Sequence, residues 1–133
     1  GLATLIARAQ QDLNVSPVFQ GKIVPRGDMV DVRAKGRATA NTDEIIIIVF
    51  ASKPRATGAM VSDLVEKDRK NAVGVEQKTK KDNQSLILAL PQQGTQHKYL
   101  CYLTQKKGHT LVITLVYMEG KVTSITELRK LIQ

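Results

Sequence analysis

The side chains best suited to chemistry in this sequence are lysines that gather where chain reversals are expected. Lys78, Lys80 and Lys81 precede an Asp-Asn turn signal, and Lys106 and Lys107 precede Gly108. Lys78 and Lys80 alternate, so on a strand both side chains point to one face. If the two turns lie at one end of a sheet, these lysines form a positive rim. We therefore predict the five as tentative anion-contact residues.

Residues that could serve as nucleophiles or acid–base catalysts are few, and their spacing keeps them apart. His97 and His109 are expected at opposite ends of a hairpin, which prevents a shared metal or a catalytic dyad within one chain. Cys101 is expected in the middle of a strand, where a thiol is a buried packing group. The sequence contains no phosphate-binding glycine loop, no Gly-x-Ser-x-Gly and no His-Glu-x-x-His. We predict no catalytic, cofactor-binding or metal-binding residue and no enzyme. The alternative is a small enzyme with a site that the spacing of residues in the sequence does not reveal.

The composition restricts the partners of the chain. It has 133 residues with 20 basic and 12 acidic side chains, giving a formal charge of +8. Such a field attracts nucleic acid, anionic lipid, lipopolysaccharide or acidic glycans, although basic residues spread along the chain also serve solubility alone. Aromatic residues make up only 4% and there is no Trp, so surfaces that stack bases are scarce. Nucleic-acid or other polyanion binding is therefore the first alternative function.

Hydrophobic periodicity predicts three helices. Residues 2–13 and 57–71 each carry one apolar stripe, and the second has acid-to-base pairs Asp63–Lys67 and Glu66–Lys70 on its other side. Residues 124–132 begin with a capping box and end in a short apolar face. We expect these helices to cover a sheet.

The expected sheet combines continuous apolar strands with alternating ones. Residues 45–50 and 86–90 are uninterrupted apolar runs, which predicts interior strands covered on both faces, the second ended by Pro91. Residues 18–24 are a candidate short strand, residues 33–41 a loop or exposed strand end, and residues 73–80 a half-buried strand. These segments predict one α+β domain over residues 1–133, with an antiparallel-rich sheet of five or six strands packed with about three helices.

The clearest unit is a hairpin formed by residues 98–105 and 110–118. Tyr99, Cys101 and Leu103 share one face of its first strand, and the second strand alternates in the same way. Gly108 supplies the positive φ that a tight turn favours.

The charged hairpin turn 106–109, the apolar strand 111–118, Gly120 and a helix with Leu128 and Leu131 resemble the end of a family of uncharacterised bacterial envelope proteins, a domain of unknown function. This resemblance implies a small exported or lipid-anchored domain and supplies no catalytic residue. The architecture also resembles the small α+β domains of the photosystem-accessory and nuclear-transport-factor type.

The expected function is a non-enzymatic binding or structural module of the bacterial cell envelope, with an anionic envelope component or a protein as its partner. No cofactor and no transmembrane span are expected. The sequence begins with Gly1 instead of Met, so we expect that an export signal or lipid anchor has been removed, and a periplasmic or envelope location.

Overall fold

The computed structural model describes residues 13–24, 27, 29–39, 42–52, 55–93 and 96–120, and it gives β1 and β2 as backbone. Its helices are α2 (Ser16–Phe19) and α3 (Arg55–Arg69), and its strands are β1 (Met29–Thr39), β2 (Thr42–Ser52), β3 (Gly74–Lys80), β4 (Asn83–Gln93), β5 (Gln96–Lys107) and β6 (Thr110–Gly120). All neighbouring strands are antiparallel, in the order β1-β2-β6-β5-β4-β3. The predicted α+β class with an antiparallel sheet is confirmed.

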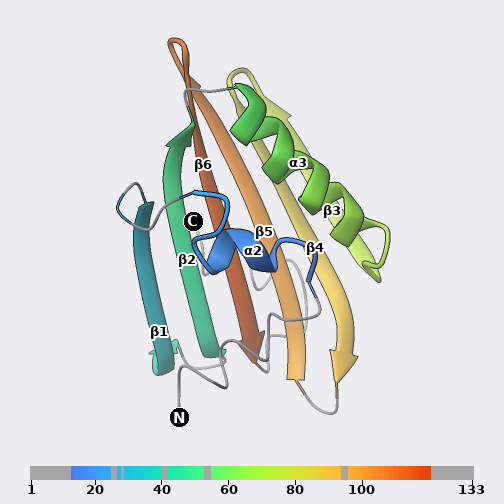
Figure 1. Cartoon of the computed structure of the whole chain (residues 1–133). Coiled ribbons are helices and arrows are strands. Elements are labelled where there is room, and N and C mark those ends of the chain that lie inside the picture. Colours follow the sequence, from blue (N-terminus) through green and yellow to red (C-terminus); the bar gives the residue numbers. More distant parts are fainter. Residues whose placement is uncertain are drawn as a thin grey trace.

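The two helices lie on the same face of the sheet, which we call the helix face (Figure 1). This arrangement matches the larger hydrophobic cluster, in which Phe19 of α2 and Val61 and Val65 of α3 pack with sheet residues including Leu88 and Leu115. The described residues contain two helices, fewer than the three expected. The expected helix at residues 124–132, and all of the expected helix at residues 2–13 except Leu13, fall outside the described residues.

Helix α3 confirms the helix predicted over residues 57–71 and begins two residues earlier. Val61 and Val65 are four positions apart and therefore lie on one stripe, where both are almost fully buried. On the solvent side Glu66 pairs with Arg69 at 3.6 Å, which is an i,i+3 pair and differs from the predicted Glu66–Lys70 pair. Exposed pairs of this kind stabilise a helix by only a few tenths of a kcal/mol.

The strand predicted at residues 18–24 is wrong, because this stretch opens with the short helix α2 and continues as turns. Pro17 occupies the first turn of α2, where its fixed φ suits a helix and its missing N–H costs nothing. The buried carboxylate of Asp68 accepts hydrogen bonds from Asn14 N at 2.7 Å, Asn14 Nδ2 at 3.0 Å and Val15 N at 3.0 Å. Asp68 therefore attaches the start of α2 to the end of α3.

Long-range pairing accounts for three further differences from the sequence predictions. Residues 33–39, expected as a loop or strand end, continue β1 because they pair with β2. Pro91 lies inside β4 and does not end it, since the β3 pairing stops at Ala89 and the missing N–H of Pro91 faces no β3 partner. The valines expected on the buried side of residues 73–80 are exposed, Val73 at 73% and Val75 at 43%, because β3 is the last strand in the order.

The continuous apolar run at residues 45–50 lies within β2, between β1 and β6, and the run at residues 86–90 lies within β4, between β3 and β5. Both are interior strands, as predicted. Leu86, Leu88 and Leu90 contribute to the helix face. Ile87 joins a second buried cluster on the face turned away from the helices, which we call the opposite face and which contains Ile87, Tyr99, Cys101, Val116 and Met118.

The predicted hairpin is confirmed as β5 and β6, with Lys107 opposite Thr110 and Gly108 at φ +63°. Its predicted alternation is also confirmed. Tyr99 and Cys101 lie on the opposite face, whereas Leu100 and Tyr102 belong to the helix face.

Candidate functional site

The two turns that carry the predicted lysines lie side by side at one end of the sheet. Asn83 at the start of β4 pairs with Gln105 near the end of β5, which places the β3–β4 and β5–β6 turns at the same end. The backbone N–H of Lys106 donates to the carbonyl oxygen of Asp82 at 3.0 Å and joins the two turns directly. The condition for a basic rim at one end of the sheet is therefore met.

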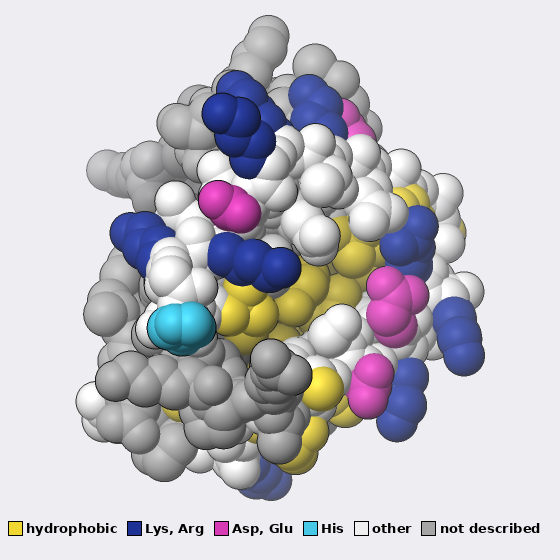
Figure 2. All heavy atoms as spheres, turned by 90° about the horizontal axis from the view of Figure 1, so that it is seen from above, with side chains coloured by type: hydrophobic (Ala, Val, Ile, Leu, Met, Phe, Trp, Pro, Cys, Tyr) yellow, Lys and Arg dark blue, Asp and Glu magenta, His cyan; other side chains and the backbone are white. Residues whose placement is uncertain are grey.

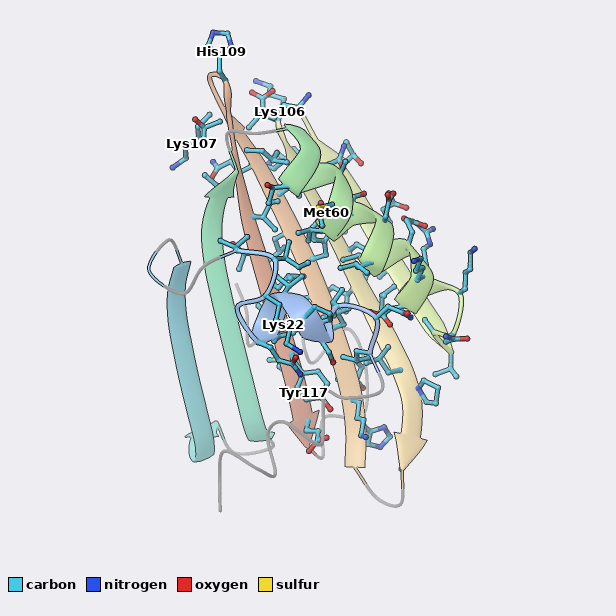
Figure 3. The ribbon with its side chains drawn as sticks, viewed as in Figure 1. Lys22, Met60, Lys106, Lys107, His109 and Tyr117 are labelled. Atoms are coloured by element: carbon cyan, nitrogen blue, oxygen red, sulfur yellow. The ribbon has the colours of Figure 1, made fainter. Side chains whose placement is uncertain are left out.

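The five predicted lysines are nevertheless divided between two cavities. Lys78 and Lys80 line a cavity on the opposite face, whereas Lys81 and Lys106 line a cavity on the helix face. Lys107 belongs to neither set of lining residues. Figure 3 shows its side chain on the other side of the β5–β6 hairpin from the side chain of Lys106. All five side chains are exposed. The sequence predicted the residues but not this division.

The first cavity, the opposite-face cavity, has a volume of about 420 Å³. Strand register explains why it forms. In the row of Glu76, Ile87, Cys101 and Val116 the three members on β4, β5 and β6 are apolar. The next row towards the turns is Lys78, Ser85, Leu103 and Thr114. Beyond it lies a row of Lys80, Asn83, Gln105 and Val112. Small and polar side chains thus partly replace the core as the sheet approaches its end, so this cavity is lined by hydroxyl, amide and ammonium groups together with Leu103 and Val112.

The second cavity, the helix-face cavity, has a volume of about 330 Å³ and lies between the first half of α3 and the two turns. It is lined by Gly58, Ala59, Ser62, Lys81, Asp82, Gln84, Tyr102, Thr104, Lys106 and Leu111. A hydrogen bond links the Tyr102 hydroxyl to Ser62, and burial raises the pKa of Tyr102 above its usual value despite that bond. Figure 2 looks down on this end of the molecule and shows a hollow floored by hydrophobic side chains with basic groups at its edge.

The histidines and the cysteine lie where the sequence predicted. His109 is in the β5–β6 turn, whereas His97 pairs with Gly120 at the far end of the same hairpin. Cys101 is fully buried in the middle of β5, and burial raises the pKa of its thiol from 9.0 to about 12. The thiol therefore stays protonated at neutral pH and is a poor nucleophile.

Sequence reasoning missed one polar cluster on the helix face, at the end away from the turns. The hydroxyl of the fully buried Tyr117 donates to Glu119 Oε1 at 2.7 Å, and Lys98 Nζ lies 3.8 Å from the same oxygen. Tyr117 and Glu119 are two apart on β6, and Lys98 is the cross-strand partner of Glu119. The signal available in the sequence was opposite charge at paired positions of a predicted hairpin.

Among the described residues, no group of three or more His, Cys, Asp or Glu side chains could hold a metal ion. In the same part of the chain, no helix is both long and apolar enough to cross a bilayer.

The architecture places the chain among α+β proteins built on an antiparallel sheet with helices on one face. The chain belongs to the Family of unknown function (DUF6108), whose model matches residues 2–132. The match covers nearly the whole chain. No curated protein matches the chain.

Proposed function

We propose that this protein is a non-enzymatic binding module of the bacterial cell envelope, which holds an acidic saccharide in the opposite-face cavity. The observation that carries the proposal is that Lys78 and Lys80 project from alternate positions of β3 into a cavity whose other polar lining consists of hydroxyl and amide groups. The envelope location is supported by the resemblance of the C-terminal hairpin and helix to bacterial envelope proteins.

The chemistry of this lining fits a charged sugar. Ser85 and Thr114 offer hydroxyls and Gln105 offers an amide, groups that donate and accept hydrogen bonds as sugar hydroxyls require. The two ammonium groups supply charge-assisted hydrogen bonds to a carboxylate or phosphate on the same ligand. Because Lys78 and Lys80 are two residues apart on a strand, their Cα atoms are about 7 Å apart, which suits successive charges along a chain.

An acidic saccharide is preferred to nucleic acid because no aromatic ring is among the residues that line the opposite-face cavity. Proteins that bind single strands without sequence preference combine basic grooves with exposed aromatic rings. Tyr99 and Tyr117 are buried in the sheet, and Tyr102 lies on the helix face, away from Lys78 and Lys80. Ammonium groups without rings favour a ligand that is recognised by charge and hydroxyls.

The alternative of an enzyme has one observation in its favour, the cluster of Tyr117, Glu119 and Lys98. A partly buried carboxylate beside an ammonium and a phenol is an arrangement that catalytic sites use. Cross-strand pairing gives this cluster a structural explanation as well, since it satisfies a Tyr hydroxyl buried inside the sheet. The buried Cys101 and the separated histidines support a protein that binds and does not catalyse.

The proposal is tested by measuring binding of short alginate oligosaccharides, which carry one carboxylate per sugar, by isothermal titration calorimetry. We expect the native protein to bind them and the double variant Lys78→Gln/Lys80→Gln to lose at least tenfold in affinity. The matched control Lys67→Gln/Lys70→Gln removes the same charge from exposed positions near the end of α3, and it should bind within about twofold of the native protein.

Two results would contradict the proposal. Equal losses in the two double variants would show that only the net charge matters. Stronger binding of mixed-sequence single-stranded DNA than of alginate, fading steeply with salt, would favour the nucleic-acid alternative.

A further inference from the structure

The helix-face cavity exists because α3 carries small side chains where it approaches the turns. Gly58 and Ala59 stand in the first half of the helix, whereas Val65 and Asp68 fill the contact in the second half. The helix therefore packs closely at one end and leaves a space of about 330 Å³ at the other. At about 30 Å³ for each water-sized group, that space admits on the order of ten non-hydrogen atoms.

The chemistry of this space changes from its floor to its mouth. Leu111 and the ring of Tyr102 provide an apolar floor, and Ser62 is hydrogen-bonded to Tyr102 at the wall. Lys81 and Lys106 stand on the two neighbouring turns at the mouth, as the position of Lys106 beside the start of α3 shows (Figure 3). Asp82 is the one carboxylate among the lining residues, and it leaves the pair of ammonium groups with a net positive charge. Gln84 and Thr104 also line the cavity, which therefore combines an apolar floor with polar walls and a cationic mouth.

The backbone at the mouth fixes where the Lys81 side chain stands. Lys81 has φ +49°, the one positive φ of a non-glycine residue in the described part of the chain. The neighbouring turn meets the same requirement with Gly108, at φ +63°. A side chain in this region costs roughly 1–2 kcal/mol, and the two-residue turn between β3 and β4 imposes it. The strained residue here is a lysine that lines the cavity.

We propose that the helix-face cavity binds a small amphiphilic anion, meaning a short hydrocarbon body that carries one phosphate or carboxylate group. The hydrocarbon body rests on Leu111 and the Tyr102 ring, and the oxyanion meets the ammonium groups of Lys81 and Lys106. The site uses neither Lys78 nor Lys80, so it is separate from the saccharide site proposed on the opposite face.

The experiment compares hexyl phosphate with its two halves, inorganic phosphate and 1-hexanol, by isothermal titration calorimetry. We expect hexyl phosphate to bind at least tenfold more tightly than either half, because the apolar floor and the cationic mouth act on one molecule. We expect Lys106→Gln to weaken hexyl phosphate binding at least fivefold. A melting curve of each variant confirms that it is folded.

The matched control is Lys107→Gln, the same change one residue further on, at a side chain that does not line this cavity. It should leave the affinity for hexyl phosphate within about twofold, as should Lys78→Gln/Lys80→Gln. Equal losses in Lys106→Gln and Lys107→Gln would overturn the proposal, as would equal affinity for hexyl phosphate and inorganic phosphate. Because the two sites use different lysines and different probes, failure of one leaves the other intact.

Discussion

The two faces of the sheet bury their side chains in different ways. On the helix face, α2 and α3 add Val15, Val18, Phe19, Val61 and Val65 to the sheet residues and produce one large cluster. On the opposite face, the described side chains form a buried cluster of five around Cys101, and within one row of side chains this cluster gives way to the cavity lined by Lys78 and Lys80. Among the side chains that the structure describes, the helix face therefore contains the larger buried cluster, whereas the opposite face combines a smaller cluster with an open cavity.

The largest expected effect compares two neighbours on β4 that point to different faces. Leu88→Ala empties a fully buried position in the large cluster, and we expect it to reduce the free energy of unfolding by about 4 kcal/mol. Ile87→Ala removes a similar volume from the small cluster, and we expect a loss of about 2 kcal/mol because fewer neighbours surround it. Urea unfolding measures both. Equal losses would mean that the buried clusters on the two faces contribute equally to the free energy of unfolding.

The second prediction concerns the thiol at the centre of the opposite face. In the unfolded chain the Cys101 thiol ionises with a pKa near 9.0, whereas burial raises its pKa to about 12 in the folded protein. Above pH 9 the unfolded state binds fewer protons, so stability is complete below pH 9 and falls towards pH 12, by up to about 1.4 kcal/mol per pH unit.

The matched variant for this prediction is Cys101→Ala, which removes the thiol and leaves every other ionisable side chain in place. Urea unfolding at pH 8, 9, 10 and 11 should show a shallower decline in the variant than in the native protein. If the free energy of unfolding falls equally with pH in both proteins, burial does not raise the pKa of the Cys101 thiol.

The third prediction tests the hydrogen bonds by which Asp68 attaches the start of α2 to α3 on the helix face. Asp68→Asn weakens the charge-assisted hydrogen bonds to Asn14 and Val15, and we expect a loss of about 2 kcal/mol in the free energy of unfolding. Asp63→Asn on the exposed side of α3 makes the same chemical change and should alter stability by less than about 0.5 kcal/mol. A null result for Asp68→Asn would mean that packing alone holds the start of α2.

The smallest expected effect concerns the end that both faces share. Lys81→Gly relieves the positive φ and should stabilise the protein by up to about 1 kcal/mol. Gly108→Ala introduces the same strain in the neighbouring turn and should destabilise by about 1 kcal/mol, because nothing lies within 4 Å of the added methyl group to compensate or obstruct it. Thermal unfolding measures both. A destabilised Lys81→Gly variant would show that the lysine side chain stabilises its turn.

Local pattern predicted the elements in which neighbours along the chain suffice. The hairpin of β5 and β6 and helix α3 follow from alternation, Gly108 and a single apolar stripe. Prediction was wrong where distant residues decide. Val18 and Phe19 are β-formers that fold as α2, because Pro17 suits the first turn of a helix and Asp68, about fifty residues away, accepts the backbone N–H groups of Asn14 and Val15 just before that helix. Pro91 is accommodated in β4 only because β3 ends before it.

The candidate site was predictable as a set of residues but not as an arrangement. Spacing placed Lys78 and Lys80 on one face, and turn signals placed Lys81 and Lys106 at reversals. Which cavity each lysine lines depends on the register between β3, β4 and β5 and on the small residues of α3. The residues next to each lysine in the sequence show neither the register nor the position of α3. The single rim that we predicted is therefore divided between two cavities in the structure.

Lys80 and Lys81 are consecutive residues, yet each faces a different cavity, and the amide of Lys106 ties their turn to the next one. A single peptide bond therefore separates residues that belong to the two proposed sites. If a ligand in one cavity alters the affinity of the other cavity, thermodynamic reciprocity requires the reverse effect to have the same factor. Titrating each ligand in the presence of the other would show whether this two-residue reversal transmits an effect through the thickness of the sheet.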